Sequence, residues 1–183
     1  MKRPSKSFEI VLAAIACAVA SGALTLGCYV NFLYAAGIIL AVFAIMVPLS
    51  KNFIWGAALA FLGSVLLTFL FYGFSIFKLI PYILFFGLHP IANYLQLKYV
   101  KRKWIHAPVL IAKAVWFILS MWLSFELIAV QFFAVDQTTW YEWVMQYFHY
   151  VLWFGGAAIF VAYDIMMFLC QKSVDTLIKR IRR

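Results

Sequence analysis

The sequence contains few charged residues, and few of these are acidic. Charged residues make up 11% of the 183 positions, with only six aspartates and glutamates. Hydrophobic residues make up 67%, whereas soluble globular domains contain roughly 45–50% apolar residues. A water-soluble domain is therefore excluded, and the composition predicts an all-α integral membrane protein.

Motifs that would identify a catalytic centre are also missing. The sequence contains no HExxH, no GxSxG and no glycine-rich loop for binding phosphate. Its three cysteines, Cys17, Cys28 and Cys170, do not have the spacing of metal ligands, so we expect neither a metal site nor a disulfide. The sequence predicts a protein that is not an enzyme and that has no cofactor.

Long apolar runs, in contrast, fill most of the chain. A helix needs about 20 apolar residues to cross a bilayer, and six runs approach or exceed that length. They cover approximately residues 8–26, 32–49, 53–71, 79–97, 107–134 and 144–170. The start of the chain, with Ala18-Val19-Ala20, resembles a signal peptide, but the apolar run continues beyond it and we expect a retained first span. We predict a single transmembrane domain over residues 1–183, folded as a six-helix bundle.

The positions of the basic residues predict the orientation of this bundle. Thirteen of the fifteen lysines and arginines flank span ends on one side of the predicted membrane, and Lys78 alone lies on the other. The positive-inside rule then places both termini in the cytoplasm. This placement accounts for the net charge of +9 without a nucleic-acid partner. The final residues, 173–183, form a pattern typical of a short amphipathic helix at an anionic lipid surface.

The fourth run carries a polar stripe. In a helix, the spacing of Tyr82, Phe86, His89, Asn93 and Gln96 places all five on one face. Exposure of a polar group to the lipid hydrocarbon is unfavourable in free energy. We therefore expect this helix face to point into the bundle. Pro90 is expected to kink the helix, with Gly87 easing the bend. The stripe is either part of a functional site or a packed kink with a satisfied histidine.

Ionisable residues within the other runs supply further candidates. Lys113 and Asp164 lie at similar depth in adjacent antiparallel spans, which predicts a structural ion pair, although Lys113 is also able to extend to the headgroups. Glu126 and His149 lie in the outer halves of their spans, and we predict that they contact a substrate. Trp153 shares a helix face with His149. Tyr82, His89 and Asn93 complete the predicted substrate-binding set.

The first run has small residues repeated every four positions. Ala14, Ala18 and Gly22 form one row, and Ala16 and Ala20 form a second beside it. Rows of this kind let another helix approach closely. These rows either pack against other helices inside the bundle or form a docking surface for a partner protein.

The length, the six spans and the Ala-xxx-Ala pattern resemble the substrate-binding S components of energy-coupling factor transporters, which are bacterial cytoplasmic membrane proteins. That resemblance implies a small vitamin-like or other organic ligand, and a transmembrane coupling subunit driven by two ATPases. It assigns Ala14-xxx-Ala18 and Ala16-xxx-Ala20 to docking on the coupling subunit. The stretch from Pro81 to Pro90, PYILFFGLHP, is also similar to one in uncharacterised small membrane proteins of Gram-positive bacteria.

Substrate capture for an importer is therefore the leading hypothesis from the sequence. The alternative is a non-transporting assembly or regulatory subunit, whose small-residue faces only pack partner helices in the lipid bilayer. A lipid-processing enzyme comes third, because no set of residues supports such chemistry.

Overall fold

A computed structural model describes residues 6–73, 76–132, 146–148 and 150–181, and these residues are all-helical, without a strand. Five helices are long and apolar enough to cross a membrane. The chain is thus a membrane-embedded protein, and five of the six predicted spans correspond to these helices. The five are α1 (Lys6–Tyr29), α2 (Tyr34–Ser50), α3 (Ile54–Tyr72), α5 (His106–Phe132) and α7 (Gly156–Ile181).

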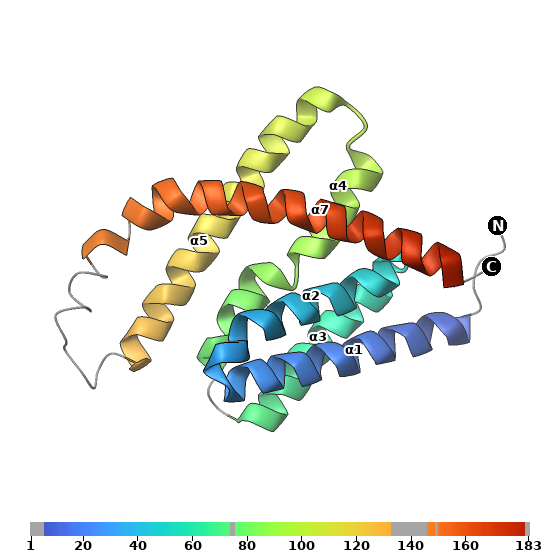
Figure 1. Ribbon diagram of the computed structural model, residues 1–183, viewed down its shortest axis with the longest axis horizontal. Helices are drawn as coiled ribbons and strands as arrows, with labels where there is room; N and C mark the ends of the chain where they lie inside the picture. Colours follow the sequence, from blue (N-terminus) through green and yellow to red (C-terminus); the bar gives the residue numbers. More distant parts are fainter. Residues whose placement is uncertain (1–5, 74–75, 133–145, 149, 182–183) are drawn as a thin grey trace.

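Helices α1, α2 and α3 pack side by side (Figure 1). Their contacts rest on small residues: Ala20, Ala41 and Ala57 are fully buried. At Gly37 a Cβ atom would lie 2.5 Å from the carbonyl oxygen of Ala23, so only glycine permits the observed approach of α2 to α1. Close backbone approach increases the number of dispersion contacts along these helices.

The fourth apolar run does not form the single kinked helix expected over residues 79–97. It comprises a 3₁₀ turn (Ile76–Leu79), a π-helical turn (Tyr82–Phe86) and the helix α4 (His89–Tyr99). The chain turns at Gly87, whose amide donates to the carbonyl of Tyr82 over 2.8 Å. Pro90 therefore lies in the first turn of a new helix, where its missing N–H breaks no bond. The helical path is interrupted at Gly87 and Leu88, just before Pro90, rather than kinked within one continuous helix as predicted.

The broken segment nevertheless runs the full length of α2. At one end, the Nζ atom of Lys78 donates to the carbonyl of Cys28 and to Oδ1 of Asn31, each over 2.9 Å, at the connection between α1 and α2. At the other end, the hydroxyl of Tyr94 donates to Oδ1 of Asn52 over 2.6 Å, at the connection between α2 and α3.

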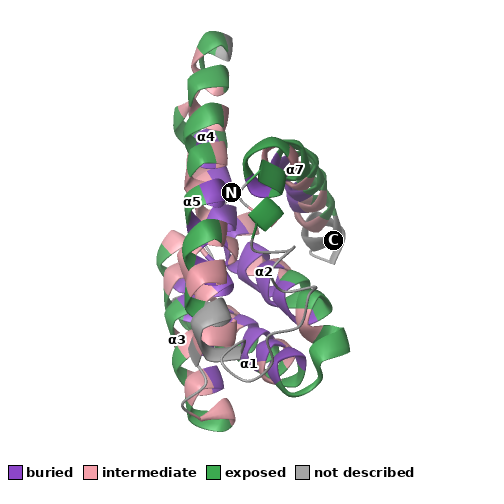
Figure 2. Ribbon diagram, turned by 90° about the vertical axis from the view of Figure 1, so that its left-hand side faces the viewer, coloured by how far each residue is buried: buried purple, intermediate pink, exposed green. Residues whose placement is uncertain are grey.

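Helix α7 lies across α5 and α2, and the connection from α4 to α5 projects beyond the other helices (Figures 1 and 2). The first turn of α1 and the last turn of α7 lie at the same end of the molecule. The C-terminal segment is not a separate amphipathic helix as expected, since α7 continues unbroken to Ile181. A continuous backbone hydrogen-bond ladder needs no break where the sequence turns polar.

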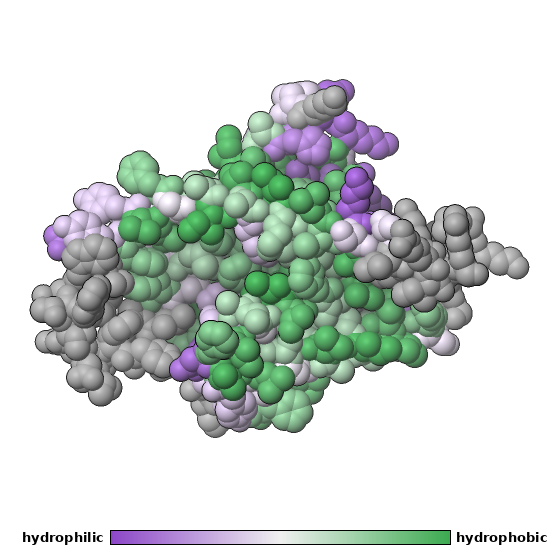
Figure 3. All heavy atoms as spheres, viewed as in Figure 1, coloured by the Kyte–Doolittle hydropathy of each residue, from purple (hydrophilic) through white to green (hydrophobic). Residues whose placement is uncertain are grey.

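The molecular surface is mainly hydrophobic. In Figure 3, hydrophilic residues gather around the projecting connection between α4 and α5 and near the end of α7. Large apolar side chains are exposed along the helices between these regions, including Ile10, Leu59, Leu66 and Ile111. Such a surface is stable when lipid covers it.

Candidate functional site

Three helices place four polar side chains together inside the bundle. His89 and Asn93 come from α4, Lys113 from α5 and Asp164 from α7. The Nζ atom of Lys113 lies 2.6 Å from Oδ1 of Asp164, and Nε2 of His89 lies 3.0 Å from the same oxygen. Lys113 also donates to Oδ1 of Asn93 over 2.9 Å. We call these four residues the charged cluster.

The charged cluster is shielded from solvent and enclosed by aromatic rings. His89 is fully buried and Lys113, the most exposed member, is 6% exposed. The centroid of the His89 ring lies 4.9 Å from that of Phe85 and 5.0 Å from that of Tyr163. The ammonium group of Lys113 lies 5.0 Å from the ring centroid of Phe168. In such surroundings an unpaired charge is expensive, so the ion pair holds α5 and α7 in register.

Several polar atoms at the charged cluster are buried without a hydrogen-bond partner among the described residues. They are Nδ1 of His89, Nδ2 of Asn93 and the hydroxyl of Tyr163. Most buried polar groups in folded proteins are paired. The charged cluster thus keeps unused hydrogen-bonding capacity on two sides of the ion pair.

The remaining members of the polar stripe also face inward but reach different neighbours. The hydroxyl of Tyr82 lies 3.1 Å from Oγ of Ser64 on α3. Nε2 of Gln96 lies 3.0 Å from Nδ1 of His106 at the start of α5. Tyr82, Asn93 and Gln96 are all buried, as the spacing predicts, although the backbone between them is broken.

The structure does not gather the predicted substrate contacts around one point. Glu126 is half-buried on α5, thirteen residues beyond Lys113, or about 20 Å along the helix at 1.5 Å per residue. Trp153 is 55% exposed. His149 lies outside the described residues. His89 and Asn93 are instead held by Lys113 and Asp164, and Tyr82 by Ser64.

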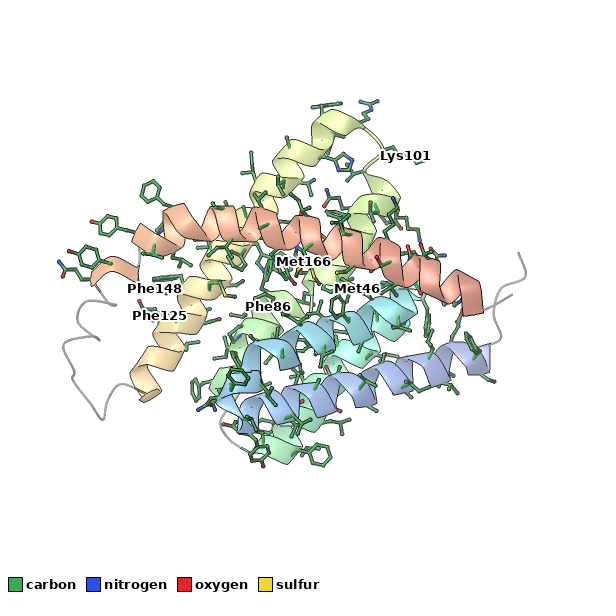
Figure 4. All side chains as sticks on the ribbon, viewed as in Figure 1. Met46, Phe86, Lys101, Phe125, Phe148 and Met166 are labelled. Carbon is green, nitrogen blue, oxygen red and sulfur yellow. The ribbon has the colours of Figure 1, made fainter. Side chains whose placement is uncertain are left out.

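Near the outer half of α5, Phe125 and Phe148 stack with their ring centroids 3.6 Å apart (Figure 4). The two side chains point toward one another from α5 and from the segment that precedes α7. Phe125 precedes Glu126, the predicted substrate residue on α5, in the sequence.

Sequence reasoning paired Lys113 with Asp164, and the structure contains that pair. It missed that His89 and Asn93 join the pair, and it missed the ring of Tyr163 beside them. The available signal was the scarcity of polar residues within the apolar runs: a lysine, an aspartate and a histidine in such runs each need a partner.

The two rows of small residues on α1 have different environments. Ala16 and Ala20 are 4% and 0% exposed and pack within the bundle. Ala14, Ala18 and Gly22 are exposed. A Cβ atom built at Gly22 would meet no atom within 4 Å. We call Ala14, Ala18 and Gly22 the outer small-residue row.

Within the described ranges, no group of three or more histidine, cysteine, aspartate or glutamate side chains is placed to hold a metal ion. The three cysteines are free thiols. Comparison of the chain with protein-family models, with curated proteins and with solved structures gave no match.

Proposed function

We propose that this protein is a docking subunit of a membrane complex, and that α1 packs against a transmembrane helix of its partner. The observation that carries the proposal is the outer small-residue row, which faces away from the bundle while the neighbouring Ala16 and Ala20 face into it. In lipid, helices associate through close van der Waals packing, and exposed small residues permit it.

In its specific form, the proposal makes the partner the coupling subunit of an energy-coupling factor importer, with two ATPases supplying the energy. This protein then captures a small organic nutrient. Glu126 on α5, with His149 and Trp153, would contact the nutrient toward the end of the bundle opposite α1's first turn. The resemblance in architecture and the outer small-residue row support this form.

A second candidate is a non-transporting assembly or regulatory subunit. It is favoured by the internal use of Tyr82, His89 and Asn93, whose side chains bind Ser64, Asp164 and Lys113 rather than converging on one space. Both candidates require α1 to dock, and they differ in whether a small molecule and ATPases accompany the protein.

The proposal includes six membrane crossings with both termini in the cytoplasm. The segment 76–99 would be the fourth crossing, because its ends reach the turns at both ends of α2. The first turn of α1 and the last turn of α7 lie at the same end of the molecule, which supports an even number of crossings. Lys51 is next to Asn52 at one end of α2, and Lys78 lies at the other end. The orientation therefore rests on the excess of basic residues at the two termini and in residues 98–103.

The docking test compares two double variants on α1. Ala14→Leu with Ala18→Leu adds bulk to the exposed row, and Ala16→Leu with Ala20→Leu adds the same bulk to the buried row. Partners are identified by mass spectrometry of the complex isolated from native membranes. We expect the first variant to keep the wild-type thermal stability and lose the partner, and the second to lose stability.

The identity of the partner separates the candidates. A coupling subunit with ATPases, together with a bound small molecule, supports substrate capture, whereas a partner complex without ATPases supports the assembly subunit. Retention of every partner by the variant with bulk at Ala14 and Ala18 would refute docking through α1.

Orientation has a separate test in intact cells, using a background without native cysteines. A cysteine at Thr138 is expected to react with a membrane-impermeant thiol reagent, and one at Arg102 is expected not to react. The reverse labelling would refute the proposed orientation.

A further inference from the structure

Two hydrogen-bond donors in the charged cluster meet on one carboxylate oxygen. Both Nε2 of His89 and Nζ of Lys113 bind Oδ1 of Asp164, at 3.0 and 2.6 Å. One negative charge balances one positive charge here while His89 is neutral. In that state the imidazole donates Nε2–H to the carboxylate, and its Nδ1 keeps a lone pair.

That lone pair accepts no hydrogen bond from any of the described residues. Nδ1 of His89 is buried and has no hydrogen-bond partner among the described residues, so it is able to take up a proton without losing a hydrogen bond. A proton on this atom would give His89 a positive charge. His89 and Lys113 would then be two cations that contact the single carboxylate of Asp164.

We propose that the charged cluster is a proton-binding site in the bundle, at which a proton on Nδ1 of His89 displaces Lys113 from Asp164. The inference does not depend on the proposed docking function. Protonated His89 and Asp164 then form the neutral pair, and the ammonium group of Lys113 leaves the carboxylate.

Geometry decides which cation leaves. The ring of His89 is fully buried beside the rings of Phe85 and Tyr163, so it is unable to withdraw without opening the packing. Lys113 has a flexible four-carbon side chain and is already 6% exposed. Long cationic side chains in membranes are able to extend toward the headgroups.

The groups that face His89 from each neighbouring element are few. Tyr163 and Asp164 approach from α7, Lys113 from α5, and Phe85 from the π-helical turn. No other carboxylate among the described residues binds His89 or Lys113. The charge balance therefore depends on Asp164 alone, and departure of Lys113 also leaves Oδ1 of Asn93 without its donor. Proton binding would loosen α5 from α4 and α7.

The first experiment measures the thermal unfolding midpoint of the purified full chain in lipid nanodiscs at about pH 8 and about pH 5, a range that spans ordinary histidine titration. In the wild type, the folded state resists a second cation that the unfolded chain accepts, so we expect the midpoint to fall on acidification. His89→Gln keeps an N–H for Asp164 and removes the titration, so its midpoint is expected to stay nearly constant. His106→Gln serves as the matched control and is expected to behave as the wild type.

Lys113→Met provides the sharpest contrast. Without the lysine, Asp164 has only His89 as a counter-charge, so protonation of His89 restores neutrality. The unfolding midpoint of this variant is expected to rise on acidification, opposite in sign to the wild type. Because an unpaired, buried Asp164 would also bind a proton on acidification, the NMR measurement below is needed to assign the proton to Nδ1 of His89.

A second measurement covers the case in which Lys113→Met fails to fold. Nitrogen-15 NMR of the histidine rings in the wild type, assigned with His89→Gln, reports the protonation of each ring nitrogen. We expect His89 to carry a proton on Nε2 alone at about pH 8 and on both nitrogens at about pH 5. A wild-type midpoint that matches that of His89→Gln, or a His89 ring that stays in one state over this range, would overturn the proposal.

Discussion

The first three helices and the rest of the chain are held together by different means. Helices α1, α2 and α3 meet through alanines and glycines, with backbone atoms close enough that Gly37 has no room for a Cβ atom. The segment 76–99, α5 and α7 meet through aromatic rings and through the buried charges of Lys113 and Asp164.

This difference shows two ways to stabilise helices in lipid, where burial of apolar surface does not drive association. Small residues increase the area of close contact. Buried polar pairs instead penalise any separation that leaves a charge alone. The first kind of contact tolerates no added volume, and the second tolerates no removal of a partner. The following predictions test that contrast, from the largest expected effect to the smallest.

Removing Asp164 is expected to have the largest effect. Asp164→Leu leaves Lys113 buried without its counter-charge and is predicted to lower the free energy of unfolding by about 3–5 kcal/mol. Denaturant unfolding in mixed micelles measures the change. Combining Asp164→Leu with Lys113→Met removes both charges and is expected to recover much of the loss. A double variant no more stable than Asp164→Leu would contradict the assignment of the loss to an unpaired charge.

Adding one methyl group at Gly37 tests the close-packed region. A Cβ atom there would lie 2.5 Å from the carbonyl oxygen of Ala23 and 3.2 Å from Cα of Gly27. Gly37→Ala is therefore expected to cost about 1–3 kcal/mol of stability through overpacking. The matched control is Gly22→Ala, where a Cβ atom meets nothing within 4 Å, and it is expected to be neutral or to gain up to about 1 kcal/mol from helix propensity. Equal effects at the two glycines would be inconsistent with the described packing.

A smaller effect is expected where the two regions share a polar contact. Tyr82→Phe removes the hydroxyl that lies 3.1 Å from Oγ of Ser64, at an expected cost of about 1 kcal/mol. Ser64 keeps its bond to the carbonyl of Phe61 over 2.8 Å, which limits the loss. A double-mutant cycle with Ser64→Ala isolates the coupling, and strict additivity of the two changes would show that the contact contributes nothing.

The smallest effect is expected at Pro90. The π-helical turn already ends at Gly87 through its bond to the carbonyl of Tyr82, and Pro90 lies in the first turn of α4. Pro90→Ala is therefore expected to change the free energy of unfolding by less than about 1 kcal/mol. A large loss, or displacement of His89 from Asp164 seen by NMR, would mean that Pro90 itself maintains the break.

Much of the fold follows from composition and periodicity. The apolar runs located α1, α2, α3 and α5 to within three residues, because about 20 apolar residues have no stable place but a membrane or a large core. Helix α7 extends to Ile181, eleven residues beyond the predicted end of the last span. The period of 3.6 residues also predicted which side chains of the fourth run face inward, and Tyr82, His89 and Asn93 are buried as expected. The membrane-embedded, all-helical class was thus determined by the sequence alone.

Other features were decided by tertiary contacts. Periodicity states that Ala14 and Ala18 share one face and Ala16 and Ala20 another, but only the packing of α2 and α3 on α1 shows which face is covered. The break at Gly87 is instead local, since it consists of backbone bonds to Tyr82 and Phe85 within one turn, but the helical pattern on either side of it looks continuous in the sequence.

The charged cluster shows the same division. The sequence determined that Lys113 and Asp164 lie at one depth, because antiparallel neighbours of known length align their ends. Only the tertiary structure decided that His89 would meet the same carboxylate oxygen, since the rotation of α4 about its axis is set by the break before it and by the rings packed around it. The depth of a residue along a helix follows from its position in the sequence. The neighbour that its side chain contacts depends instead on how all the surrounding helices pack.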